Sequence, residues 1–252
     1  MPAVWDHSSI YSGGDITAER LTKALGYPFW SPESSFVLNT STGSLQQVPD
    51  EDVADLLPGR TPALAIGSNA APEHLRWKFA DRFGDPLVVA TTVRITDFEV
   101  VYAAHLSRYG SVPATMVSAA GTTVQLKLLW STPEQTALMH QSESLGADYA
   151  IAQVDRANIV TSETVAAFLN GHEHLEFYEA LAGPLQVGGS PVALSAIRAQ
   201  GRGWRAKGQR EMLTLLAEAA GYHSIEQMLG VTTAAAGPWE EFNRRMREDE
   251  LL

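Results

Sequence analysis

The chain of 252 residues contains no cysteine, which excludes disulfides, thiol nucleophiles and metal sites built from thiolates. It also lacks any uninterrupted apolar run close to the ~18 residues that a membrane-spanning helix needs. Residues 1–6 carry neither the basic region nor the apolar region of a secretory signal. Together these absences predict a cytoplasmic protein that does not associate with a membrane.

Basic residues are also few. Lys and Arg number 18 against 29 Asp and Glu, so the formal net charge is −11. An acidic balance of this size argues against general binding to nucleic acids or to anionic membranes. A chain of this length can bury a sizeable core, and we expect one large domain or a domain with an appendage.

The composition changes along the chain and predicts three parts. Residues 1–60 are rich in Ser, Pro and Asp and hold too few apolar side chains for a core of their own. We therefore expect an N-terminal arm packed on the core, with a short helix that begins after Thr17 and ends at Gly26. Residues 61–184 contain several Val-rich and Thr-rich segments with few helices between them, which favours an α+β domain whose mixed sheet curls into a β-barrel. Residues 185–252 are predicted to form a helical C-terminal extension that packs on this barrel.

Local patterns place the elements of these parts. Strands are predicted at 86–94, 98–104, 114–117 and 122–130, with a turn containing Gly121 between the last two. After Thr161, apolar residues spaced by three and four predict helices at 165–169, 175–181, 191–200, 208–220 and 233–249.

One loop stands out as a candidate for binding. An apolar run that begins at Pro62 stops at the polar tripeptide Gly67-Ser68-Asn69, and Pro72 follows at the start of an amphipathic segment. This order predicts a strand, a tight loop and a helix, so the loop amides lie near a helix start and can stabilise an anion or an oxyanion. An ordinary strand-to-helix turn capped by Ser or Asn is the alternative. Ser68 as a nucleophile lacks the flanking glycines and an assignable histidine base.

A single carboxylate completes a minimal acid/base site. Thr132, a first-turn proline and Gln135 predict the start of a helix, and Glu143 falls near the end of that helix. The helix dipole disfavours a negative charge at this end, which is a mild sign of a functional role. A solvated surface glutamate is the alternative interpretation.

These residues resemble a known family. Ile66-Gly67-Ser68-Asn69 is similar to the Tyr-Gly-Ser-Asn loop of the gamma-glutamylcyclotransferase-like proteins. The resemblance runs in consistent order over residues 62–155, through 94–98, 113–116, 124–130 and the segment that ends at Tyr149. It implies a mixed β-barrel with flanking helices and a C-terminal helical extension.

The resemblance also implies a chemistry. Glu143 matches the family's general acid/base, and the residues at the substrate-binding positions are Ile66, Gly67, Ser68, Asn69 and Tyr149. The implied partner is a small gamma-glutamyl substrate, which cyclises to 5-oxoproline with release of an amine or peptide. This chemistry requires no metal and no organic cofactor. Tyr149 as a buried structural tyrosine is an equal alternative.

The sequence departs from the family at three positions. Ile66 stands where the family most often has tyrosine, His140 where aspartate is common, and Ser144 in place of a glycine. These changes are consistent with a different substrate or with lost activity. A non-catalytic ligand-binding or scaffold protein of the same fold, and a hydrolase of amides or esters, therefore stay open as alternatives. The released amine and the oligomeric state are also open.

Two further clusters have plain interpretations. His172-Glu173-His174 invites a metal site, but alternate residues on a helix point apart and no third ligand is evident. A basic island follows later in the chain, made of Arg198, Arg202, Arg205, Lys207 and Arg210. It could bind an anionic ligand or partner, although pairing with the acidic surface is favoured. The Gly-x-Gly within it lacks the dinucleotide-binding spacing.

Overall fold

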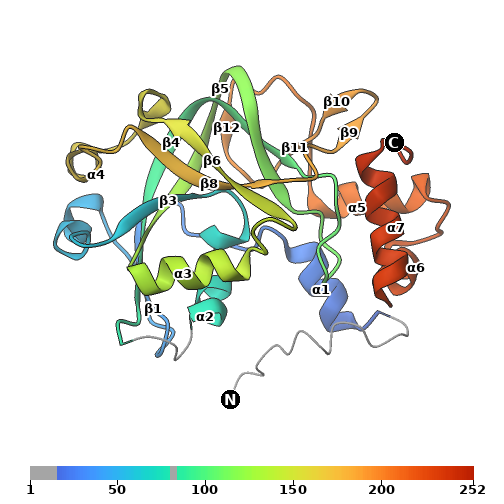
Figure 1. The fold of residues 1–252 in the computed structure, drawn as a ribbon, viewed down its shortest axis with the longest axis horizontal. Helices are drawn as coiled ribbons and strands as arrows, with labels where there is room; N and C mark the ends of the chain where they lie inside the picture. The colour runs from blue at the N-terminus through green and yellow to red at the C-terminus, as the bar shows by residue number, and fades with distance from the viewer. Residues whose placement is uncertain (1–15, 80–83) are drawn as a thin grey trace.

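The computed structural model describes residues 16–79 and 84–252, and its fold is a mixed α+β arrangement (Figure 1). Residues 1–15, the first part of the predicted N-terminal arm, lie outside the described residues. The helices are α1 (Ala18–Gly26), α2 (Pro72–Phe79), α3 (Pro133–Ser142), α4 (Glu163–Phe168), α5 (Gln209–Ala219), α6 (Ile225–Thr232) and α7 (Ala236–Arg247). The 3-10 helices among the described residues are η2 (Asp50–Leu56), η3 (Ser68–Ala70) and η4 (Arg156–Asn158).

The strands form one large sheet and a small hairpin. They are β1 (Phe36–Asn39), β2 (Leu45–Gln47), β3 (Thr61–Ala65), β4 (Leu87–Tyr102), β5 (Ala114–Ser131), β6 (Tyr149–Asp155), β7 (Ile159–Val160), β8 (His174–Ala180), β9 (Gln186–Val187), β10 (Ser190–Pro191), β11 (Ala193–Leu194), β12 (Ala199–Gln200) and β13 (Ala206–Lys207). The large sheet has the order β13-β11-β4-β5-β3-β8-β6, with β1, β2, β7 and β12 paired off this path. The β3–β8 and β11–β13 pairs are parallel and the other pairs in the large sheet are antiparallel, so the sheet is mixed. Pairing of the described residues does not join β13 to β6, and closure into a barrel stays a prediction.

Two long antiparallel strands, β4 and β5, form the centre of the sheet. The sequence predicts four strands here, and the structure joins them into two. Asp97 adopts a positive φ of 61° at an irregularity where the register moves from Thr96↔Thr123 to Phe98↔Ser118. The Asp97 carboxylate accepts a hydrogen bond from the Gly121 N–H at 2.8 Å. The residues expected to form a turn at Gly121 therefore bulge out of a continuing ladder.

Apolar residues gather on both faces of the sheet. The main cluster includes Leu64, Ile66, Val93 and Leu126, whereas a smaller cluster includes Ala65 and other residues of the opposite face. Helices α2 and α3 cover this second face, where Leu75, Phe79 and Met139 pack against Ala65 and Leu129. Figure 1 shows these two helices together below β3 and β8. Their packing brings the loop before α2 and the last turn of α2 against the end of α3.

The N-terminal part of the chain contributes to the main sheet and its core and does not lie only on their surface. Helix α1 begins as predicted, since the Thr17 side chain accepts a hydrogen bond from the Arg20 N–H at 3.2 Å. Strand β1 then pairs with β4, and its Phe36 and Leu38 are buried in the smaller cluster. This part therefore adds strands and core residues to the main sheet.

Two predicted helices are strands in the structure. Residues 175–181 were expected to be helical, but β8 buries Leu175 and Phe177 and exposes Glu176, which is the alternation of a strand. Residues 191–200 contain β11 and β12, which bond to β4 and β5. In both cases partners distant in sequence override a weak helical spacing. Part of the segment 185–252 thus belongs to the sheet, and its helices begin only at α5.

The last three helices pack on the body of the protein. Leu213, Leu216, Phe242 and Met246 are buried in the main apolar cluster and Trp239 is also buried, whereas Trp204 is only partly buried. Three hydrogen bonds join α7 to Leu106 in the loop after β4. The Asn243 side chain accepts from the Leu106 N–H at 2.7 Å and donates to the Leu106 carbonyl at 3.2 Å, and the Trp239 ring N–H donates to the same carbonyl at 3.0 Å. Within the described ranges, no helix has the length and apolar character to cross a membrane.

Candidate active site

The loop Gly67-Ser68-Asn69 leaves the end of β3 and leads into α2, as the sequence predicts. The Gly67 and Ser68 carbonyls accept hydrogen bonds from the N–H groups of Ala70 and Ala71, both at 3.0 Å, which closes the turn η3. Among the described residues, none accepts a hydrogen bond from the N–H groups of Gly67, Ser68 and Asn69. Three unused donors in one tight turn are suited to hold an anionic or strongly polarised oxygen.

Glu143 stands at the C-terminal end of α3. The helix begins with the predicted capping box, in which Thr132 and Gln135 cap one another's backbone. It ends at Glu143, whose N–H donates to the Met139 carbonyl at 3.1 Å. Ser144 follows with a positive φ of 51°, the conformation for which glycine is the usual residue. This break in the helix turns the chain away and leaves the Glu143 side chain at its edge.

The structure brings Glu143 and the loop together. Asn69 Nδ2 donates a hydrogen bond to Glu143 Oε1 at 3.1 Å. The Lys78 ammonium donates to Asn69 Oδ1 at 2.8 Å and forms an ion pair with the same Oε1. The Lys78 side chain is 5% exposed and that of Glu143 is 13% exposed, so this pair is largely removed from water. Buried charges persist in proteins when they are paired in this way.

Sequence reasoning missed Lys78, although a signal was present. Leu75, Lys78 and Phe79 are spaced by three and four on α2, and all three are buried. A lysine within the apolar stripe of an amphipathic helix needs a buried partner. The partner, Glu143, lies 65 residues further along the chain.

The two oxygens of Glu143 have different surroundings. Oε1 accepts hydrogen bonds from the side chains of Asn69 and Lys78. Oε2 accepts no hydrogen bond from the described part of the chain. One oxygen is therefore held in position and the other is left to meet a ligand.

Four tyrosines lie within electrostatic reach of this carboxylate: Tyr27, Tyr109, Tyr149 and Tyr178. Burial raises the pKa of each phenol and the charge of Glu143 raises it further, to about 12 for Tyr109. All four are neutral near pH 7 and can donate hydrogen bonds. The predicted site residue Tyr149 also packs edge-on against the ring of His105, with 5.8 Å between the ring centres.

Tyr27 brings a hydroxyl to the loop from the N-terminal part of the chain. Its Oη accepts a hydrogen bond from the Ala114 N–H at 2.7 Å. A Cβ atom built on Gly67 would lie 2.2 Å from the same oxygen, so only glycine fits at this position. The side chain of Ile66, which is also a predicted substrate-binding residue, is buried in the main apolar cluster. The hydroxyl that Ile66 lacks is thus present beside the loop, supplied by Tyr27.

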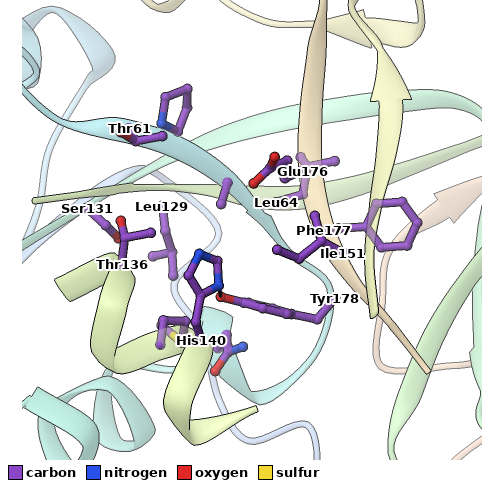
Figure 2. A pocket seen from close by; sticks show the side chains of 14 residues that line it. Thr61, Leu64, Leu129, Ser131, Thr136, His140, Ile151, Glu176, Phe177 and Tyr178 are labelled. Carbon is purple, nitrogen blue, oxygen red and sulfur yellow. Dashed lines mark hydrogen bonds between the residues drawn. The ribbon is translucent and has the colours of Figure 1, made fainter. Parts of the chain in front are cut away.

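A narrow groove lies next to these residues, between α3 and strands β3 and β8 (Figure 2). Its volume is about 40 Å³. Of the predicted site residues only Asn69 lines it, and Glu143 and Tyr149 do not. The side chains of His140 and Tyr178 point toward one another in Figure 2, and Tyr178 Oη lies 2.9 Å from His140 Nδ1. His140 therefore contacts this groove.

The other two clusters have partners of their own. His174 starts β8, and its Nδ1 lies 2.7 Å from Asp155 Oδ1 on β6. No group of three or more possible metal-ligating side chains occurs in the residues that the structure describes. In the basic island, Arg202 pairs at 2.6 Å with the fully buried Glu99, and Arg198 pairs with Glu33. Two members of the island thus take acidic partners, as expected.

Comparisons with known proteins give limited results. No protein-family model matches the chain. No curated protein sequence matches it. Two solved structures show a partial likeness. One is an uncharacterized protein from Homo sapiens, with 16% identity, a TM-score of 0.35, and coverage of 48% of this chain and 70% of that one. The other is described as a gamma-glutamyl cyclotransferase, with 15% identity, a TM-score of 0.33, and coverage of 48% and 69%. At these values neither likeness assigns a function to the chain.

Proposed function

We propose that the protein is an enzyme of the gamma-glutamylcyclotransferase type, which converts a gamma-glutamyl amide to 5-oxoproline and a free amine. The observation that carries the proposal is the contact between Glu143 and Asn69, because it sets one placed carboxylate against a turn with three unused amide donors. The resemblance of residues 62–155 to this family, read from the sequence, supports the same assignment.

The reaction needs one base that later acts as an acid. The substrate's α-amine attacks its own γ-carbonyl carbon, a new C–N bond closes the five-membered ring, and the original amide C–N bond breaks. Glu143 takes a proton from the attacking nitrogen and returns a proton to the leaving nitrogen, so the carboxylate is regenerated. Proton transfer by a positioned side chain contributes about 10²–10⁴-fold to rate.

The surrounding residues fit this cycle. Oε2 of Glu143, which has no protein donor among the described residues, is the oxygen that exchanges protons. Asn69 and Lys78 hold Oε1 and so fix the direction of Oε2. The N–H groups of Gly67 and Ser68 hold the oxygen of the γ-carbonyl as negative charge develops on it. Tyr27 and Tyr149 act as neutral donors to the polar groups of the substrate.

A non-catalytic ligand-binding protein of the same fold is the second candidate. The observation that favours it is the Lys78 ion pair, since a carboxylate already matched with a buried ammonium is electrostatically satisfied without a ligand. The two candidates make opposite predictions for turnover, although both predict that a small ligand binds.

The test is the formation of 5-oxoproline from a set of gamma-glutamyl amides, measured by mass spectrometry. Glu143→Gln preserves the shape and the contact to Asn69 but cannot exchange protons, so we expect kcat to fall at least about 100-fold. Glu134→Gln, on the exposed first turn of the same helix, is the matched control and should retain full activity. Equal turnover by the Glu143→Gln and wild-type proteins would exclude the acid/base role. Binding without turnover by the wild type would favour the second candidate.

A further inference from the structure

The groove beside α3 is a separate feature that the acid/base pair does not use. Its walls come from β3, β5, β8 and β6 on one side and from α3 on the other (Figure 2). Thr136 and His140 face it from the helix, and Ile151, Glu176 and Tyr178 face it from the sheet. Apart from Asn69 in the loop before α2, it is therefore formed by one helix and by strands.

One end of the groove meets the candidate active site. Asn69, which bonds Glu143 at 3.1 Å, is also a lining residue of the groove. Met139 is another, and its sulfur lies 3.4 Å from the Lys78 ammonium that pairs with Glu143. Tyr178 also lines the groove, and its Oη lies 2.9 Å from His140 Nδ1 on α3. Because Asn69 and Met139 belong to both places, a molecule bound at Glu143 can extend past them into the groove.

The chemistry of the lining is selective. Much of the wall is apolar, and Glu176 is the one acidic residue among the described residues that line it. Among the described residues, no lysine or arginine lines the groove. An anionic group would meet the Glu176 carboxylate and no lining lysine or arginine, whereas an alkyl chain would meet apolar walls and an ammonium would meet Glu176.

The size of the groove adds a second restriction. Its volume of about 40 Å³ is far below the roughly 300–1,000 Å³ of sites that enclose a whole drug-sized ligand. It can take only a slender part of a substrate, such as an unbranched alkyl chain. Branched or aromatic groups would require the helix to move away from the sheet.

We propose that this groove holds the leaving-amine part of the substrate, and that the preferred substrates are gamma-glutamyl derivatives of unbranched alkyl amines, neutral or carrying a distal ammonium. The inference rests on the proposed function and specifies its substrate class. Anionic leaving groups, such as amino acids and peptides with a free carboxylate, are disfavoured. The amine leaves as R–NH₂ after its nitrogen gains the proton from Glu143, and no other reactant is needed.

The experiment compares kcat/KM for four substrates with the full-length protein. They are the gamma-glutamyl derivatives of methylamine, n-butylamine, 1,5-diaminopentane and glycine. We expect the butyl and aminopentyl compounds to exceed the glycine compound by about tenfold or more, the range that one or two extra methylenes reach in an apolar pocket. If the glycine compound is the best substrate, the proposed function stands and the groove assignment is overturned. If wild-type protein releases 5-oxoproline from none of the four, the proposed function fails, and the groove assignment fails with it.

Two variants locate the effect in the groove. Glu176→Gln should lower kcat/KM for the aminopentyl compound about two- to fivefold relative to the butyl compound, as for an exposed ion pair. Glu179→Gln, on the same strand but outside the groove, should not change this ratio. Thr136→Met, which fills the groove from α3, should reduce turnover of the butyl compound roughly tenfold and spare the methyl compound. Equal losses for both compounds, or a ratio unchanged by Glu176→Gln, would place the leaving group elsewhere.

Discussion

Replacing Lys78 by methionine should destabilise the protein, because it removes the partner of a nearly buried carboxylate. Methionine matches the length and packing of the lysine stem and can contact Met139, so the change isolates the charge. Breaking one side of a buried ion pair costs about 3–5 kcal/mol. Glu143 is 13% exposed and keeps its bond to Asn69, which favours the lower end, about 3 kcal/mol. For a chain of this size, that corresponds to a fall in Tm of roughly 6–12 °C.

A double-mutant cycle separates the ion pair from simple packing loss. The free energy of unfolding is measured by urea denaturation for Lys78→Met, Glu143→Gln and the double variant. Glu143→Gln should cost less than Lys78→Met, since the amide oxygen still accepts a hydrogen bond from the ammonium. The double variant should be more stable than Lys78→Met alone, because no unpaired charge is left buried. A Lys78→Met protein as stable as wild type, with additive effects in the cycle, would show that the pair is not a buried charge contact.

Other parts of the structure give three more expected outcomes. Burial lowers the pKa of His105 to about 4 in the folded protein, against about 6.5 in the unfolded chain. Between these two values the unfolded chain binds a proton that the folded protein does not, so stability is lost as the pH falls from about 6.5 to about 4. His105→Phe should remove roughly 3 kcal/mol of this pH dependence, seen in urea denaturation at pH 4 and pH 7. Gly67→Ala sets a methyl group against the Tyr27 hydroxyl and should cost about 1–3 kcal/mol, whereas Gly203→Ala, with open space around it, should be neutral by the same assay. A chain ended at Gly183 loses β11–β13 and α5–α7 and should be insoluble or melt much lower in a thermal scan. A truncated chain that is soluble and equally heat-resistant would contradict the tight packing of that segment.

Local signals were sufficient for the two elements that carry the candidate site. The β3–loop–α2 unit is encoded by an apolar run, a small polar tripeptide and Pro72 at the first helical position. Helix α3 is encoded by Thr132 and Gln135, whose side chains act within four residues of each other. Because these signals are short-range, they are readable without knowledge of the rest of the fold. The expectation that Asn69 and Glu143 share one site came from the family resemblance, because neither local signal indicates their contact.

Long-range partners account for the elements that sequence reasoning placed wrongly. In residues 174–181, the spacing of Leu175, Tyr178 and Leu181 fits a helix, but the spacing of Leu175 and Phe177 fits a strand. Pairing with β6 and β3 decides between them, and neither partner is adjacent in the sequence. The same reason applies to β11 and β12, which are only two residues long and exist because β4 and β5 offer free edges. Short strands of this kind have no detectable pattern of their own.

Lys78 connects the stability of the protein with its proposed chemistry. Its ammonium and the Asn69 amide both hold Oε1 of Glu143, so the group that makes burial of the carboxylate tolerable also orients Oε2. The two roles can be separated, because a purely structural ion pair has no bearing on proton exchange. Lys78→Arg keeps the charge but replaces a compact ammonium by a planar fork, so it should recover most of the stability and little of the turnover. If it instead restores stability and turnover together, charge alone is sufficient and the orienting role of Lys78 is refuted.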